Sequence, residues 1–96
     1  MKILWMPESE QDLRSIYTYI AEESPKSASK VVLSLVTFTE LQLGTFPESG
    51  RTGRVTNTYE ILVPKLPYWI PYRVKNDVIE ILRVYHTRRQ WPDDLS

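Results

Sequence analysis

Three short runs of β-forming residues follow one another in the second half of the chain, and they limit the folds that are open to it. The runs are EILV (residues 60–63), YWIPYRV (residues 68–74) and VIEILRVY (residues 78–85). A turn framed by prolines separates the first two, and KND at residues 75–77 is a tight hairpin turn before the third. Because antiparallel strands can be joined by turns this short, we expect a three-stranded antiparallel meander.

The first half of the chain predicts a support for this meander. KILW at residues 2–5 is a short apolar strand. Apolar side chains then recur at helical spacing and predict an amphipathic helix over residues 7–23. The Ser-Pro pair that follows predicts the start of a second helix, with its end at Gly44. Neither helix has a histidine or a carboxylate within its apolar stripe, so we interpret both as scaffold.

The expected fold class is therefore α+β. An N-terminal strand, an antiparallel two-helix hairpin and the meander form one sheet, with both helices on one of its faces and the other face open. The length of 96 residues predicts a single domain, residues 1–96. Pro71 has no N–H to donate to a neighbouring strand, so we expect a bulge or an unpaired position at that point.

The composition excludes several classes of site. The chain has no cysteine and one histidine, which excludes disulfides, thiolate metal sites and cysteine nucleophiles. We therefore expect no metal and no cofactor. Its apolar runs are too short for a signal peptide or a membrane span, so we expect a cytoplasmic protein with no membrane partner.

Charge is distributed unevenly along the chain. Residues 1–50 carry four basic and seven acidic side chains, and residues 51–96 carry eight basic and five acidic ones. The first half therefore carries a formal charge of −3 and the second half +3, although the net charge of the whole chain is zero. The positive half can face an anionic partner, but a pI of 6.6 is low for a strongly basic nucleic-acid binder.

The third run places an arginine among apolar residues. In a continuous strand its side chains alternate between two faces, and the face that carries the arginine is Ile79, Ile81, Arg83 and Tyr85. A buried arginine needs a partner. We expect Arg83 to pair with Glu60 or Glu80, or to reach the open face.

His86 follows this strand, two residues before Arg88 and Arg89. Histidine can transfer protons near neutral pH, and neighbouring arginines can hold a phosphate. This combination is what metal-free RNA cleavage requires. The simpler interpretation is a histidine that packs and forms hydrogen bonds at a strand end.

Several stretches taken together resemble the RelE/ParE family of bacterial toxins. They are GRVTNTYEILV, PYWIPYRV and VIEILRVYHTRRQWP in the second half, and PESEQDLRSIYTYIAEESP for the first helix. The resemblance covers nearly the whole chain. It implies the compact toxin fold of the family, a type II toxin–antitoxin pair, and a cognate antitoxin protein that wraps the toxin in a hetero-oligomer.

The family divides by mechanism, which leaves the target open. RelE-like members cleave mRNA on the ribosome, ParE-like members poison DNA gyrase, and some members have lost toxicity. This chain departs from the nuclease pattern, because Thr87 follows His86 where nucleases often have a tyrosine near the C-terminus, and Lys65 stands alone in place of a lysine cluster. It departs from the ParE-like pattern at Tyr59, where an arginine is usual. The ending RVYHTRRQWP is similar to the ParE-like one.

Our hypothesis from the sequence is a toxin that inhibits growth by poisoning DNA gyrase. The alternatives are a ribosome-dependent mRNA endonuclease and a non-toxic partner-binding homologue. In the nuclease, Arg83 and His86 would be the catalytic residues. The residues expected to contact the antitoxin or the target are Arg73, Arg88, Arg89 and Trp91.

Overall fold

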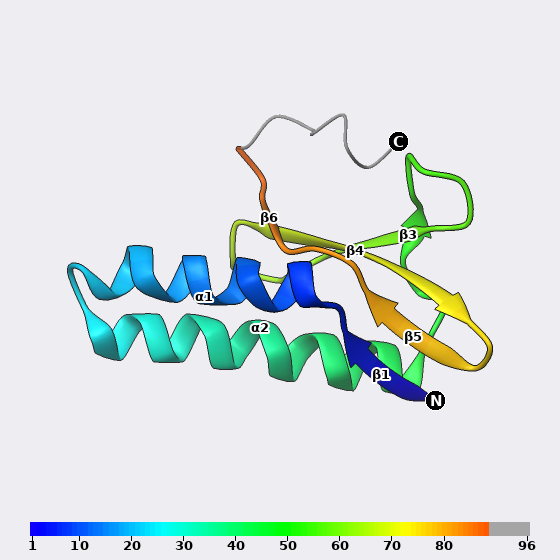
Figure 1. Ribbon diagram of the computed structural model, residues 1–96, viewed down its shortest axis with the longest axis horizontal. Coiled ribbons are helices and arrows are strands. Elements are labelled where there is room, and N and C mark those ends of the chain that lie inside the picture. Colours follow the sequence, from blue (N-terminus) through cyan, green and yellow to red (C-terminus); the bar gives the residue numbers. More distant parts are fainter. Residues whose placement is uncertain (89–96) are drawn as a thin grey trace.

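The computed structural model describes residues 1–88, and Figure 1 shows the arrangement of its elements. The chain begins with one strand and two helices and continues with five strands. In order, the elements are β1 (Lys2–Trp5), α1 (Pro7–Ala21), α2 (Pro25–Thr45), β2 (Arg51–Thr52), β3 (Tyr59–Leu62), β4 (Tyr68–Lys75), β5 (Val78–Ile81) and β6 (Tyr85–His86). The predicted α+β class, the helix hairpin and the meander are confirmed.

The strands form one mixed sheet in the order β1-β5-β4-β3-β2, and β6 pairs with β4. Strands β3, β4 and β5 are the predicted meander and pair antiparallel. Strand β1 lies parallel to β5 at the edge of the sheet. Two short strands extend the pairing. The sequence did not predict β2, and β6 contains Tyr85, the last residue of the third predicted strand.

Local sequence explains where the two helices begin. Pro7 and Pro25 each occupy a first turn, where the missing N–H has no helical partner to lose. The hydroxyl of Ser24 caps α2 by accepting a hydrogen bond from the Ser27 N–H at 3.2 Å. The predicted stop at Gly44 is wrong by one residue, because α2 continues through this glycine to Thr45.

Both helices cover one face of the sheet and enclose the core against it (Figure 1). Fully buried leucines of α2 meet the isoleucines and the tyrosine that the strands turn toward the helices. The residues of this core with no exposed surface are Leu35, Leu43, Ile70, Tyr72, Ile79 and Ile81. The alternation of strand side chains therefore leaves a second face of the sheet without a helix over it.

The third predicted strand is not continuous, because a bulge divides it opposite Pro71. Tyr72 lies opposite Ile81 whereas Trp69 lies opposite Tyr85, so two residues of β4 face three residues, 82–84. Hydrogen bonding between the strands continues at the bulge, because the Leu82 N–H donates to the Pro71 carbonyl oxygen at 3.0 Å. The extra residue lies on the segment opposite Pro71 and not on β4, where a bulge was expected. The predicted uninterrupted strand over residues 78–85 is wrong.

The bulge also changes which side chains share a face. One extra residue shifts the alternation, so Val84 joins Ile79 and Ile81 in the core cluster. Tyr85 instead packs against Trp69, with ring centroids 4.9 Å apart. The prediction that Arg83 and Tyr85 share a face with Ile79 and Ile81 is therefore wrong.

Candidate functional site

Arg83 is held by a carboxylate from the first helix. Its Nε donates to Asp12 Oδ2 at 2.8 Å and its Nη2 donates to Oδ1 at 3.1 Å, which is a two-pronged ion pair. The Val84 N–H also donates to Oδ2, at 2.9 Å. The prediction that Arg83 pairs with Glu60 or Glu80 is wrong, because its partner is Asp12. The bulge turns the arginine toward α1, where Asp12 lies one turn before Ile16 on the side that faces the sheet.

The two glutamates that were expected to hold Arg83 pair with other arginines. Glu80 on β5 accepts a hydrogen bond from Arg73 Nε, directly across the ladder on β4. Glu60 on β3 accepts one from Arg51 Nη2 at 3.4 Å, again from the residue opposite it. Cross-strand register therefore decides both pairs.

His86 lies at the end of the sheet and its ring is partly fixed. Its Nδ1 accepts a hydrogen bond from the Arg88 N–H at 3.1 Å. The imidazole meets the Tyr68 ring edge-on, with centroids 5.4 Å apart. Nε2 is the nitrogen that is left for a partner.

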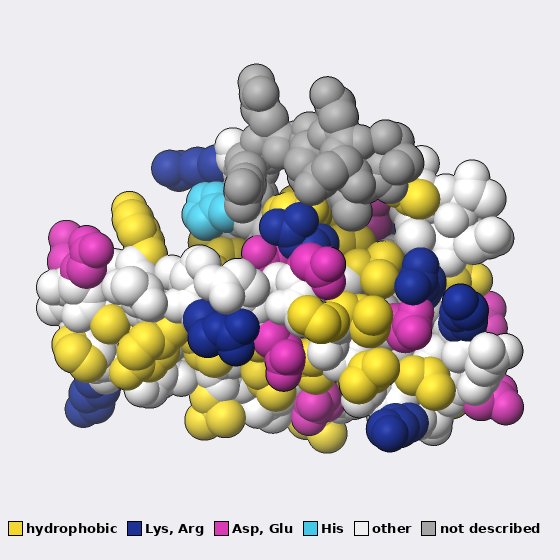
Figure 2. Space-filling view, in the orientation of Figure 1, with side chains coloured by type: hydrophobic (Ala, Val, Ile, Leu, Met, Phe, Trp, Pro, Cys, Tyr) yellow, Lys and Arg dark blue, Asp and Glu magenta, His cyan; other side chains and the backbone are white. Residues whose placement is uncertain are grey.

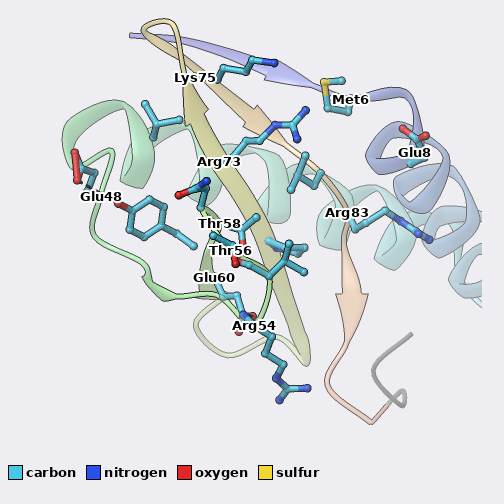
Figure 3. A pocket seen from close by; sticks show the side chains of 16 residues that line it. Met6, Glu8, Glu48, Arg54, Thr56, Thr58, Glu60, Arg73, Lys75 and Arg83 are labelled. Atoms are coloured by element: carbon cyan, nitrogen blue, oxygen red, sulfur yellow. Dashed lines mark hydrogen bonds between the residues drawn. The ribbon is translucent and has the colours of Figure 1, made fainter. Parts of the chain in front are cut away.

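Two depressions flank Arg83, and it contributes to the wall of both. The larger hollow, of about 940 Å³, lies over the uncovered face of the sheet and is drawn in Figure 3. Its wall includes Glu8, residues 54–60, Arg73, Lys75 and Arg83. The smaller hollow, of about 410 Å³, lies between α1 and β6 and includes Ile16, Tyr19, Ile20, Tyr68 and His86.

The predicted site residues are therefore divided between two places. Arg73 and Arg83 share the larger hollow, and Arg83 and His86 share the smaller one. Neither of these two hollows has both Arg73 and His86 in its wall. Arg88 is exposed at the end of the described chain, and the predicted contacts Arg89 and Trp91 lie outside the described residues.

Burial raises the pKa of two core tyrosines above the usual 10.0. For Tyr68 burial is the main cause, and Tyr19 adds to it. For Tyr72 burial is again the largest cause, and the hydrogen bond from the Gly50 N–H to its hydroxyl, 3.0 Å long, acts in the opposite direction. Both phenols are therefore protonated near neutral pH.

No group of three or more histidine, cysteine, aspartate or glutamate side chains gathers at metal-binding distance within residues 1–88. Over the same residues no helix is long and apolar enough to cross a membrane.

The comparison with known families identifies the chain. Residues 3–91 match the family described as the ParE toxin of the type II toxin–antitoxin system parDE. The chain belongs to the ParE toxin family. The RelE/ParE resemblance seen in the sequence is thereby confirmed. The match begins in β1 and includes both helices and the whole described sheet.

Individual relatives of this ParE-family chain agree in length as well as in sequence. The protein Y4kP of Sinorhizobium fredii is 39% identical over 94 residues, covering 98% of this chain and 96% of that one. Toxin RelE2 of Caulobacter vibrioides is 33% identical over 88 residues, covering 92% and 97%.

Solved structures extend the likeness to the fold. A chain of the chromosomal ParDE system from P. aeruginosa superposes with a TM-score of 0.79 at 29% identity, covering 92% of this chain and 97% of that one. The isolated RelE toxin of E. coli superposes with a TM-score of 0.60 at 13% identity, covering 93% and 86%, which shows the shared fold alone.

The roles of two anchoring carboxylates in this ParE-family chain, Asp12 and Glu60, were not found from the sequence. No carboxylate was expected within the apolar stripe of the first helix, and this is wrong because Asp12 faces Arg83 and a backbone N–H of the bulged segment. The signal was its spacing of four and eight residues from Ile16 and Ile20, which places it on the same side of α1. Glu60 is buried and anchors the preceding loop, and its position inside the apolar run EILV was the corresponding signal.

Proposed function

We propose that this ParE-family protein arrests bacterial growth by binding a protein target, DNA gyrase, without performing a proton-transfer reaction of its own. The observation that supports this is the state of the side chains that a nuclease would need. Arg73 and Arg83 are each held by a carboxylate, and Arg73 lines the larger hollow whereas His86 lines the smaller one.

A nuclease needs a base, an acid and a cation around one phosphate. Here Arg83 lines the smaller hollow together with His86, and Asp12 occupies two of its donors. An arginine in a two-pronged pair with a carboxylate has less positive potential to offer a transferring phosphate. The arrangement therefore supports a binding role for this surface.

A cognate antitoxin protein is the second partner that we propose. Large apolar side chains remain exposed on both helices, and Figure 2 shows hydrophobic side chains at the surface along them. The most exposed are Tyr19 at 78%, Leu41 at 68% and Leu33 at 67%. An antitoxin segment that folds on binding would remove these side chains from water.

The test compares His86→Ala with wild type in three assays. They are growth after induction, supercoiling by purified gyrase, and cleavage of ribosome-bound mRNA. A gyrase poison keeps its potency within a few-fold after this change, because no proton is transferred. A nuclease that uses the imidazole loses about 10²–10⁴-fold in rate.

The control is the thermal midpoint of His86→Ala, which must stay near that of wild type for the comparison to count. The proposal is overturned if wild type cleaves ribosome-bound mRNA and the folded variant does not. A wild-type protein that arrests neither growth nor gyrase supports the non-toxic alternative.

A further inference from the structure

The segment 50–58 includes the short strand β2 and leads into β3, and its own hydrogen bonds close it. We name it the rim loop. The Gly53 N–H donates to the Thr58 carbonyl oxygen at 2.7 Å. The hydroxyl and the N–H of Thr58 both donate to the Val55 carbonyl oxygen, at 2.7 and 3.2 Å. Asn57 has a φ of 66°, in the left-handed region that asparagine tolerates better than most residues. The backbone of the rim loop is thus fixed along most of its length.

Two glycines of the rim loop are required by close approach. A Cβ on Gly53 would lie 2.2 Å from Thr58 Oγ1. A Cβ on Gly50 would lie 2.7 Å from the Glu60 carbonyl oxygen and 2.8 Å from the Tyr72 hydroxyl. Any other residue at these positions would force the loop or its neighbours to move.

Glu60 joins the rim loop to the sheet. Only 5% of its side chain is exposed. Its Oε2 accepts a hydrogen bond from the Arg54 N–H at 3.1 Å, and its Oε1 accepts one from Arg51 Nη2 at 3.4 Å. A buried carboxylate is costly unless such donors satisfy it. The carboxylate therefore sets the position of the loop relative to β3.

The tip of this fixed loop presents polar side chains to the larger hollow. Arg54, Thr56 and Asn57 are exposed, and none of them belongs to the core cluster. Figure 3 shows Arg54 and Thr56 coming from the loop, and Arg73 and Lys75 coming from the sheet, around the same hollow. A loop whose backbone is held firmly while its tip adds nothing to the core is suited to binding.

The chemistry around the hollow indicates an anionic oxygen ligand. Glu80 holds Arg73 through Nε, which orients the guanidinium and leaves its Nη groups as donors. The exposed Lys75 ammonium and the hydroxyl and amide of the loop tip add further donors. Two exposed carboxylates, Glu8 and Glu48, line the same wall and would repel a continuous row of phosphates. Together with the pI of 6.6, this favours protein carboxylates over a nucleic-acid backbone.

We propose that the rim loop and the adjoining part of β4 bind an acidic patch on the protein that this toxin inhibits. Glu60 is the positioning residue of this surface, and Arg54, Arg73 and Lys75 are its contacts. The inference rests on the proposed function for the identity of that protein, DNA gyrase.

The test reverses two charges on this surface and two elsewhere. The variant Arg54→Glu/Lys75→Glu changes the net charge by the same amount as the control Lys26→Glu/Lys30→Glu, which lies at the start of α2. Two readouts are used, growth arrest after induction and the concentration that halves supercoiling by gyrase holoenzyme on relaxed plasmid. We expect the rim variant to require about 10–100-fold more protein, and the control to stay within a few-fold of wild type.

Each outcome separates this inference from the proposed function. Equal potency of the rim variant and the control overturns the inference while gyrase inhibition by wild type stands. In another outcome, the rim variant no longer arrests growth whereas the control still does, and wild type does not inhibit gyrase. This result supports the rim loop as the binding surface and refutes gyrase as its partner. Binding of wild type to plasmid without gyrase, abolished in the rim variant, assigns the surface to nucleic acid and overturns the acidic-protein partner.

The positioning role of Glu60 is tested without changing the charges of the contacts. Glu60→Gln is expected to accelerate amide exchange in residues 53–58, to leave exchange in β4 unchanged, and to lower potency about ten-fold. If this variant does not fold, Gly53→Ala replaces it, because it displaces the same loop and leaves every charge in place. Accelerated exchange in the loop with full potency overturns the role.

Discussion

Removal of the Asp12 carboxylate is expected to destabilise the fold at the junction of α1 with the bulge. Asp12→Ala deletes the acceptor of three hydrogen bonds, two from Arg83 and one from the Val84 N–H. The guanidinium is left with only 22% of its side-chain surface exposed, so water cannot fully replace the lost partner. The Val84 N–H also loses its acceptor.

The magnitude follows from burial of the pair. Breaking a fully buried ion pair by removing one partner costs about 3–5 kcal/mol, and an exposed pair is worth less than about 1 kcal/mol. Asp12 and Arg83 are 12% and 22% exposed, which places them toward the buried limit. Alanine regains roughly 0.5 kcal/mol through its better helix propensity. We expect a net loss of about 3 kcal/mol, or roughly 12–24 °C in thermal midpoint for a domain of this size.

The assay is a double-mutant cycle measured by urea unfolding at neutral pH. Arg83→Met combined with Asp12→Ala removes both charges and fills much of the arginine's volume with an apolar side chain. This double variant should lose only about 1 kcal/mol, mainly from the unpaired Val84 N–H. Asp12→Asn is the matched control, since its amide oxygen can still accept a hydrogen bond from the Val84 N–H. Its free energy of unfolding should lie between those of wild type and Asp12→Ala.

Two results would refute this reasoning. One is a loss below about 1 kcal/mol for Asp12→Ala, which would mean that water satisfies the arginine as well as the carboxylate does. The other is a double variant whose loss equals the sum of the two single losses, because independent effects would show that the pair has no coupling energy.

Two further predictions concern pH and metal. Burial raises the pKa of the Tyr72 phenol above 10.0, so its contribution to stability is complete below about pH 10 and is lost as the pH rises from there through the folded-state pKa. Tyr72→Phe should therefore flatten the decline of unfolding free energy in that range, as measured by urea titration, and an unchanged slope would contradict the assignment. Inhibition by the purified protein should survive treatment with EDTA followed by dialysis, since no metal-binding group gathers within residues 1–88, and a loss restored by added Zn²⁺ would contradict this.

The sequence by itself determined the two helices, the antiparallel meander and the family. Apolar spacing in α1 and α2 and the short turns between β3, β4 and β5 are local properties, and each can be read within a few residues. Pro71 indicated that strand pairing is irregular at this point, because the missing N–H follows from the covalent structure of proline. The quoted runs were enough to indicate the RelE/ParE family, because they occur together over nearly the whole chain.

Only the tertiary structure decided which charges meet. One extra residue at the bulge reversed the side-chain alternation, and Arg83 then met Asp12 across 71 positions of sequence instead of either expected glutamate. Register assigned Glu80 to Arg73 and Glu60 to Arg51. Ion pairs of this kind depend on the summed geometry of several elements, and a one-residue shift changes every partner beyond it. For that physical reason the wall of the larger hollow could not be assembled from the sequence.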